Sequence, residues 1–331
     1  MSRKLILTLG TRLGGLLLGG WVLSVALRSA QATLSGALVR DCLPLLGLAA
    51  PWFCVPLFAT ALSWWLLFPP GSRLPLGEAT LLSWIGLAVN WVLPVATLGG
   101  EVAKFELATR PAGARGRGRG VVAATLVVDK TTQVITQLVL VGVALAALSE
   151  LSGRTSALAA SGRGVVLVGL ALGIFLWGQH AGMFGRTLRA LGQGEHRFGE
   201  AANRLDAEIA AIYRRRLALS GALLCRLAFR LLFAAEIYWA FQLFDVDCSL
   251  TTLLLLEGVV QGARMSAFVV PAGIGVQEGA LLAAGQLLGL PVEALMAAAV
   301  LKRLRELAVS LPALLVWQIL RFRKGPAAAN R

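Results

Sequence analysis

Long apolar runs separated by short charged stretches dominate this sequence. We expect nine runs, at residues 5–27, 43–68, 79–98, 120–148, 164–187, 217–244, 251–270, 277–290 and 293–320. Several of them reach the roughly 20 residues that an α-helix needs to span a bilayer. With 57% hydrophobic and 15% charged residues, the chain has too little polar surface for an ordinary soluble protein. The sequence therefore predicts an all-α, polytopic membrane protein with one transmembrane domain over residues 1–331.

The first run is expected to be a retained helix rather than a signal peptide. It has no cleavage site of small residues and is longer than the apolar core of a signal peptide, although Arg12 interrupts it. Not every run can cross, however. A helix of residues 277–290 would be about 21 Å long, against a hydrocarbon core of about 30 Å, so we expect a half-helix there.

Basic residues account for the net charge of +14 and are grouped beside the apolar runs. The groups are Arg3 and Lys4; Arg110, Arg115, Arg117 and Arg119; Arg186, Arg189, Arg197, Arg204, Arg214, Arg215 and Arg216; and Arg321, Arg323 and Lys324. Cytoplasmic loops of membrane proteins are enriched in Lys and Arg, which explains this distribution better than nucleic-acid binding does. We therefore expect cytoplasmic N- and C-termini and no nucleic-acid partner.

Two of the runs break at Pro and Gly and restart on a glutamate, with the same spacing. The segments are PVATLGGE at 94–101 and PAGIGVQE at 271–278, so Glu101 and Glu278 each lie seven residues after the proline. Matched interruptions in two halves of a membrane protein are typical of transporter substrate sites. Chance is the alternative, because Gly and Pro are common in membrane helices.

The positions of the basic groups predict from which side of the membrane the two interrupted segments enter. For all basic groups to be cytoplasmic, residues 79–110 must enter from the cytoplasm and return. For residues 251–320, a hairpin at 251–290 that enters from outside and one crossing satisfy the same requirement, and so would three crossings. The short run 277–290 favours the hairpin. Long crossing helices at 120–148 and 293–320 follow the hairpins in opposite directions. The sequence thus predicts an inverted-topology repeat, 79–148 and 251–320, with two re-entrant hairpins whose tips meet near the midplane.

Residues 195–216 separate the two repeats and alternate charged and apolar positions at helical spacing. The apolar positions are Phe198, Ala201, Leu205, Ile209, Ile212 and Tyr213. This pattern predicts an amphipathic helix on the cytoplasmic membrane surface, with arginines facing anionic headgroups. A solvated connector is the alternative.

Charged residues inside the apolar segments are the main candidates for function, because each is costly in a bilayer unless it faces a partner or a polar interior. They are Glu101, Lys104, Asp129, Lys130, Arg226, Arg230, Glu236, Glu257, Arg264, Glu278, Lys302, Arg303, Arg305 and Glu306. Structural ion pairs are the alternative, for example between Asp129 and Lys130, or between Glu306 and Arg303 or Arg305.

Arg226 and Arg230 are four residues apart and share one helix face, where they repel unless an anion lies between them. A phosphate fits, because guanidinium groups bind phosphate in a bidentate manner and half-helix N-termini add N–H donors. Glu101 and Glu278 stand in the first turn of the restarted helices. There they can cap the helix, or act as titratable or arginine-pairing groups at the midplane.

Catalytic constellations are missing from the sequence. It has two histidines, four cysteines without CxxC spacing, no GxxxxGK[ST] loop and no acidic cluster suited to a divalent metal. We expect no cofactor, no metal and no ATP hydrolysis, and do not expect an enzyme. The alternative is a membrane enzyme or subunit that modifies a lipid or lipid-linked sugar, with Glu101, Asp129 or Glu278 as general base.

The segments GGEVAK at 99–104, VVDKTTQVITQ at 127–137 and PAGIGVQEG at 271–279 resemble the flippase-like superfamily named after the transmembrane region of lysylphosphatidylglycerol synthase. The resemblance covers nearly the whole chain. Residues 129–137 and KRLREL at 302–307 look closest to hopanoid-biosynthesis-associated membrane proteins of the HpnL type. Lys130 stands where family members often have Arg, which keeps the charge but loses the bidentate fork.

This resemblance implies lipid translocation between leaflets, in a bacterial inner membrane. The chain has no soluble aminoacyl-transferase domain, so we do not expect lysyl transfer. We predict a flippase-like transporter of a polar or anionic lipid, for example hopanoid-related or polyprenyl-linked, with membrane lipids and proteins of lipid biosynthesis as partners. A scaffold for hopanoid-synthesis enzymes is a further alternative.

Headgroup binding is expected to use the charged residues and the glycines of the two breaks. The predicted site residues are Arg226, Arg230, Arg303, Arg305, Glu101, Glu278, Lys104, Asp129, Lys130, Glu257, Arg264, Gly99, Gly100, Gly273 and Gly275.

Overall fold

A computed structural model describes residues 36–92, 99–110, 118–152, 196–266 and 275–322, with the single positions 173 and 177. Within these ranges the chain is helical and has no strand. The described residues exclude the predicted run 5–27, the run 164–187 apart from positions 173 and 177, and the segments 93–98 and 267–274 at the two breaks, which include Gly273. The elements are α2 (Gly36–Trp52), α3 (Cys54–Leu67), η1 (Pro70–Ser72), α4 (Leu76–Val92), α5 (Gly99–Ala108), α7 (Arg119–Ser152), α10 (His196–Arg214), α11 (Arg216–Leu231), α12 (Ala234–Gln242), α13 (Leu250–Ser266), α14 (Val276–Leu287) and α15 (Val292–Phe322).

Three helical stretches among the described residues are long and apolar enough to cross a membrane. They are Leu38–Leu67, Arg119–Leu148 and Arg216–Gln242, of 30, 30 and 27 residues. Helix α15 has 31 residues, but its charged turn at 302–306 makes it less apolar than these three. The membrane-spanning character expected of 293–320 therefore stays a prediction.

Two of the predicted runs are broken helices. The run 43–68 forms α2 and α3, which meet at Phe53, and the run 217–244 forms α11 and α12, which meet at residues 232–233. The first break lies between Pro51 and Pro56, and proline removes a backbone hydrogen bond of a helix. The second lies in sequence without Gly or Pro, so the sequence pattern does not predict it.

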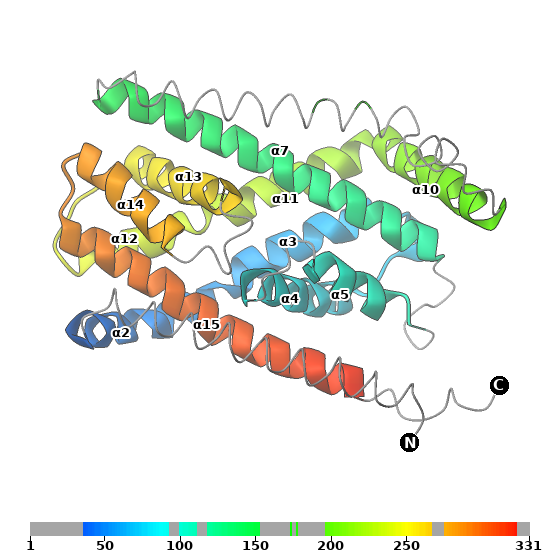
Figure 1. Cartoon of the computed structure of the whole chain (residues 1–331), viewed down its shortest axis with the longest axis horizontal. Helices are drawn as coiled ribbons and strands as arrows, with labels where there is room; N and C mark the ends of the chain where they lie inside the picture. Colours follow the sequence, from blue (N-terminus) through cyan, green and yellow to red (C-terminus); the bar gives the residue numbers. More distant parts are fainter. Residues whose placement is uncertain are drawn as a thin grey trace.

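The two predicted hairpins appear as two pairs of neighbouring helices, α4 with α5 and α13 with α14. Both pairs lie between the long helices α7 and α15, which run in opposite directions (Figure 1). Helix α4 packs against α15, whereas α13 packs against α7. Likewise α2 packs against α15, and α11 against α7. Helices α2 and α4 of the first half therefore contact the long helix of the second half, and α11 and α13 contact that of the first. The second members of the two pairs, α5 and α14, contact the long helix of their own half.

Glycines allow two of these helix contacts to be very close. A Cβ added at Gly258 of α13 would lie 2.5 Å from Cβ of Ala144 on α7, and Gly262 one turn later faces Val141. Between α4 and α5, a Cβ at Gly100 would lie 2.2 Å from the carbonyl oxygen of Gly86. Small residues four apart are a common means of close helix packing in membranes, where no hydrophobic effect drives helices together.

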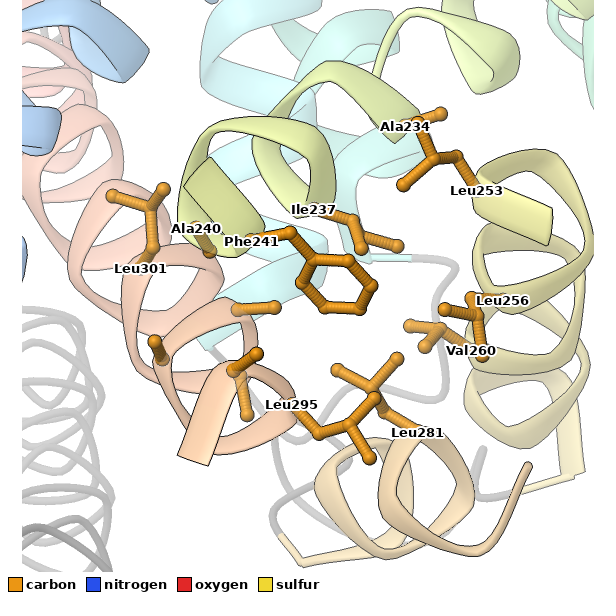
Figure 2. Packing of buried hydrophobic residues seen from close by; sticks show 14 of the residues in the cluster. Ala234, Ile237, Ala240, Phe241, Leu253, Leu256, Val260, Leu281, Leu295 and Leu301 are labelled. Carbon is orange, nitrogen blue, oxygen red and sulfur yellow. The ribbon is translucent and has the colours of Figure 1, made fainter. Parts of the chain in front are cut away.

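The main apolar core lies between α12, α13, α14 and α15. Figure 2 shows Ile237 and Phe241 of α12 pointing toward Leu256 and Val260 of α13, with Leu281 of α14 and Leu295 of α15 closing the cluster from below. A second core around Trp64 joins α3, α4, α5 and the start of α7. The two cores hold the two helix pairs in place beside the polar residues described next.

Helix α10 confirms the amphipathic helix predicted for 195–216, with two differences. Ile209 and Ile212 are buried in a cluster with Leu67 of α3 and residues of α7, so the apolar face packs against protein instead of lipid. Ala201 is exposed and its neighbour Ala202 is buried, which shifts the predicted apolar face by one position. The side chain of Phe198 lies outside the described part.

Candidate functional site: two interior clusters of charged residues

The first cluster is centred on Asp129 of α7, which is 2% exposed. Arg226 of α11 forms a bidentate ion pair with this carboxylate, with Nε 3.1 Å from Oδ1 and Nη2 2.5 Å from Oδ2. Lys104 of α5 donates to Oδ2 at 3.2 Å, and its ammonium lies 4.0 Å from the centroid of the Trp64 ring. Thr60 of α3 accepts a hydrogen bond from Nη1 of Arg226. One carboxylate thus joins four helices and two cations.

Glu101 and Lys130 extend this cluster at the start of α5. Lys130 donates to Glu101 at 3.3 Å, so it does not pair with its neighbour Asp129 as the sequence suggested. Asn90 of α4 links the two helices of the pair: its Oδ1 accepts from Gly100 N–H at 2.8 Å and its Nδ2 donates to Glu101 at 3.2 Å. Asn90 therefore bonds the N-terminal amide of α5, a role that we had considered for Glu101.

Arg230 of α11 differs from Arg226, one turn earlier. It is 2% exposed, and its hydrogen bonds go to neutral acceptors: Oγ1 of Thr136, Oε1 of Gln261, the carbonyl of Gln133 and Oε1 of Gln137. In the part of the chain that the structure describes, no carboxylate lies within 4.0 Å of it. Asp129 pairs with Arg226 and Lys104 and not with Arg230, so the anion expected between Arg226 and Arg230 stays a prediction.

The second cluster lies between α12, α13 and α15. Arg305 donates to both oxygens of Glu236, with Nε–Oε1 at 2.8 Å and Nη2–Oε2 at 2.9 Å. Lys302 pairs with Glu257 at 2.5 Å and lies 3.8 Å from Glu236. Gln261 donates to Glu257 at 2.6 Å and accepts from Arg230 at 3.1 Å, which connects this cluster to Arg230.

A third set of ion pairs follows at the start of α14. Arg303 pairs with Glu278 and, through Nη1 at 3.1 Å, with Glu306, which also pairs with Arg264 of α13. The second oxygen of Glu278 accepts from Gly275 N–H at 2.9 Å, and Gly275 has a φ of 80° that glycine adopts without strain. Glu278 therefore fulfils both predicted roles, as a helix cap and as an arginine partner.

A cleft lies beside these pairs, between α13, α14 and α15. This small cleft is lined by Lys302, Arg303, Glu278 and Glu306, together with Gln277, Val260, Leu281 and Ala299. Charged groups thus face a small opening instead of being sealed by apolar side chains.

Trp91, at the end of α4, connects the two helix pairs. Its ring centroid lies 5.6 Å from the guanidinium of Arg264, near the end of α13, and 5.0 Å from that of Arg305. Phe233 and Phe53 also lie beside Arg305, at 4.6 and 5.8 Å. The last turns of α4 and α13 therefore lie close together.

The described residues of the predicted site fall into these connected clusters, with two corrections to their expected pairing. Asp129 pairs with Lys104 and Arg226 instead of Lys130, and Glu101 pairs with a lysine instead of an arginine. Of the two partners considered for Glu306, Arg303 pairs with it, whereas Arg305 pairs with Glu236. Gly99 and Gly100 begin α5, and Gly275 precedes α14. Six residues of the clusters are absent from the predicted site: Glu236, Lys302, Glu306, Asn90, Gln137 and Gln261. The sequence analysis names Glu236, Lys302 and Glu306 among the charged residues inside apolar segments. It includes Gln137 in the segment 127–137 that resembles the family.

Comparison with known proteins supports a membrane role related to lipids. A profile of the family described as the lysylphosphatidylglycerol synthase TM region matches residues 12–313. No curated protein and no solved structure matches the chain. The family match and the apolar helices indicate a membrane protein related to lipid modification or transport. The chain belongs to the family of the lysylphosphatidylglycerol synthase transmembrane region.

Proposed function

We propose that this protein moves a lipid with a polar or anionic headgroup between the two leaflets of the bacterial inner membrane. The observation that carries the proposal is the reciprocal packing of two helix pairs on two long helices, around interior clusters of charge. Inverted repeats with broken helices at their interface are typical of membrane transporters, whose substrate sites lie near the midplane.

Reciprocal packing supports the inverted repeat. If α4 corresponds to α13 and α7 corresponds to α15, the contact between α4 and α15 is the counterpart of the contact between α13 and α7. The same exchange relates the contact of α2 with α15 to that of α11 with α7, if the broken helices α2–α3 and α11–α12 correspond. In Figure 1 the open ends of the two helix pairs face opposite ends of the molecule. This is the arrangement expected for re-entrant hairpins that enter from opposite membrane faces.

The restart glutamates support the same correspondence. Glu101 pairs with Lys130 on the long helix that follows it, and Glu278 pairs with Arg303 on the long helix that follows it. The contact of Trp91 with Arg264 supports hairpin tips that meet inside the protein. Irregular backbone at that depth is tolerated only where protein or a cavity covers it.

Two contacts support cytoplasmic termini. Arg110 at the end of α5 donates to the carbonyl of Leu320 near the end of α15, and Arg215 donates to the carbonyls of Leu66 and Leu67 at the end of α3. Several basic helix ends therefore lie together, as the enrichment of Lys and Arg in cytoplasmic loops requires.

The interior charges fit transport better than catalysis. A general base needs a lone pair directed at its substrate, whereas two cations already hold Asp129. Ion pairs that line a cleft can instead exchange partners with a polar headgroup as it passes. We propose a hopanoid-related or polyprenyl-linked lipid as substrate on the strength of the resemblance to HpnL-type proteins, and partner proteins of lipid biosynthesis on the same ground.

Translocation of a fluorescent lipid in proteoliposomes tests the proposal. Dithionite quenches only the outer leaflet, so we expect wild-type protein to expose most of the fluorophore and empty vesicles to expose about half. Arg303→Gln should slow translocation about tenfold, because it leaves Glu278 without its arginine and removes one of the two arginines that pair with Glu306 beside the cleft. Arg204→Gln is the matched control, since Arg204 lies exposed on α10.

Translocation no faster than in empty vesicles, for lipids of several headgroups, would contradict the proposal. A scaffold predicts that folded Arg303→Gln protein keeps its cellular function. A lipid-modifying enzyme predicts a mass shift of the lipid after incubation.

A further inference from the structure

We propose that the transported lipid carries a net negative charge and that its phosphate enters the interior beside Arg230. This inference rests on the proposed transport and adds the substrate class and a binding residue.

Among the described residues, the interior clusters hold more cations than carboxylates. Eight cations take part in the clusters: Lys104, Lys130, Arg226, Arg230, Arg264, Lys302, Arg303 and Arg305. Six carboxylates face them: Glu101, Asp129, Glu236, Glu257, Glu278 and Glu306. The segments 93–98 and 267–274 hold no charged residue that could supply the difference.

The excess lies on the side of α5, α7 and α11. Four cations and four carboxylates balance in the pairs of α12, α13, α14 and α15, from Glu236 to Glu306. Around Asp129, by contrast, two cations share one carboxylate, and Arg230 has none within 4.0 Å among the described residues. The charged groups that act on Arg230 are Arg226, Arg264 and Glu257, two of them with its own sign.

A buried cation that only neutral groups solvate is costly, and more so inside a membrane. Removing Arg230 should therefore cost the empty protein less than removing a paired arginine does. The unfavourable burial of Arg230 is understandable if a bound ligand supplies the negative charge that the surroundings of this residue lack. A phosphodiester has one negative charge and oxygens that match the planar guanidinium fork.

Arg230 is also connected to the cleft. It donates to Gln261 on α13, Gln261 donates to Glu257, and Glu257 pairs with Lys302, which lines the cleft. A headgroup in the cleft beside Lys302 would thus be separated from Arg230 by the side chains of Glu257 and Gln261. The side chains of Gln137 and Gln261 would have to turn to release the guanidinium.

Translocation rates of lipids that differ only in headgroup charge test this inference. We would compare fluorescent phosphatidylglycerol, phosphatidylcholine and ethyl-phosphatidylcholine, with charges of −1, 0 and +1, in the same proteoliposomes. Wild-type protein should move the anionic lipid about tenfold faster than the neutral one. Arg230→Gln should bring this ratio close to one, whereas Arg204→Gln should keep it.

Thermal stability separates binding from a structural role. Arg230→Gln should lower Tm less than Arg226→Gln does, because only the latter leaves Asp129 without its bidentate partner. Should Arg230→Gln not fold, Gln137→Glu serves as the second variant. It places a carboxylate where Oε1 now lies 3.0 Å from Nη2 of Arg230, and should abolish the preference for the anionic lipid.

Equal wild-type rates for the three lipids, or an unchanged ratio in Arg230→Gln, would overturn the inference but leave transport standing. No movement of any lipid would overturn transport itself. In detergent, stabilisation by short-chain phosphatidylglycerol and not by inorganic phosphate would support a lipid ligand. Stabilisation by inorganic phosphate alone would overturn the lipid source, and stabilisation by neither would overturn the site.

Discussion

Replacing Asp129 by Asn should lower the free energy of unfolding by about 3–5 kcal/mol, because it leaves two buried cations without their shared carboxylate. Lys104 and Arg226 are 5% and 4% exposed, so water cannot replace the lost partner without opening the contacts between α5, α7 and α11. Denaturant unfolding of purified protein in detergent measures the change.

Glu200→Gln is the control for Asp129→Asn. Glu200 pairs with Arg204 at 3.4 Å, and its side chain is 66% exposed. An exposed pair one helical turn apart contributes less than about 1 kcal/mol. If Asp129→Asn destabilised the protein no more than Glu200→Gln, the Asp129 cluster would not hold these helices together.

Glu236→Gln should also cost about 3–5 kcal/mol, since Arg305 would lose both of its charged hydrogen bonds. The double variant Glu236→Gln, Arg305→Gln should be more stable than this single variant, because two neutral amides leave no uncompensated charge at the pair. Thermal unfolding of the two single variants and the double variant gives the coupling energy. A double variant that loses the sum of the single losses would show that the pair does not act as a unit.

Helix positions followed from the sequence where apolar runs end at charge, Pro or Gly. The run 293–320 corresponds closely to α15, and the two interrupted runs correspond to α4 with α5 and α13 with α14. The break at Phe53 lies between Pro51 and Pro56, inside a run that was predicted to be continuous, whereas the break at residues 232–233 has neither Pro nor Gly beside it. There, contacts between α3 and α11 and between α12 and α15 accompany the breaks.

The residues of the site were easier to predict than the ion pairs that they form with one another. A charge at bilayer depth is conspicuous in any apolar run, so Asp129, Arg226 and Arg305 were identified readily. Asp129 and Lys130 were considered as partners, yet adjacent residues on a helix point in different directions, and each found its partner on another helix. Neutral amides such as Asn90 and Gln261 carry no such signal, and their roles depend on which helices meet.

The reciprocal packing of two halves with opposite orientation is the central claim, and cysteine labelling tests it directly. Gly71 lies between α3 and α4, where a Cβ meets nothing within 4 Å, and Asp247 lies exposed between α12 and α13. Each would be replaced by Cys after removal of the native cysteines. Native Cys248 is a poor reporter, because burial raises the pKa of its thiol. The labelling reagent is a maleimide that cannot cross the membrane, added to intact spheroplasts.

The inverted arrangement predicts that the maleimide labels Asp247→Cys in intact spheroplasts but labels Gly71→Cys only after permeabilisation. Labelling of both positions from the same side would contradict the arrangement, and with it the proposal that the two helix pairs are hairpins entering from opposite faces.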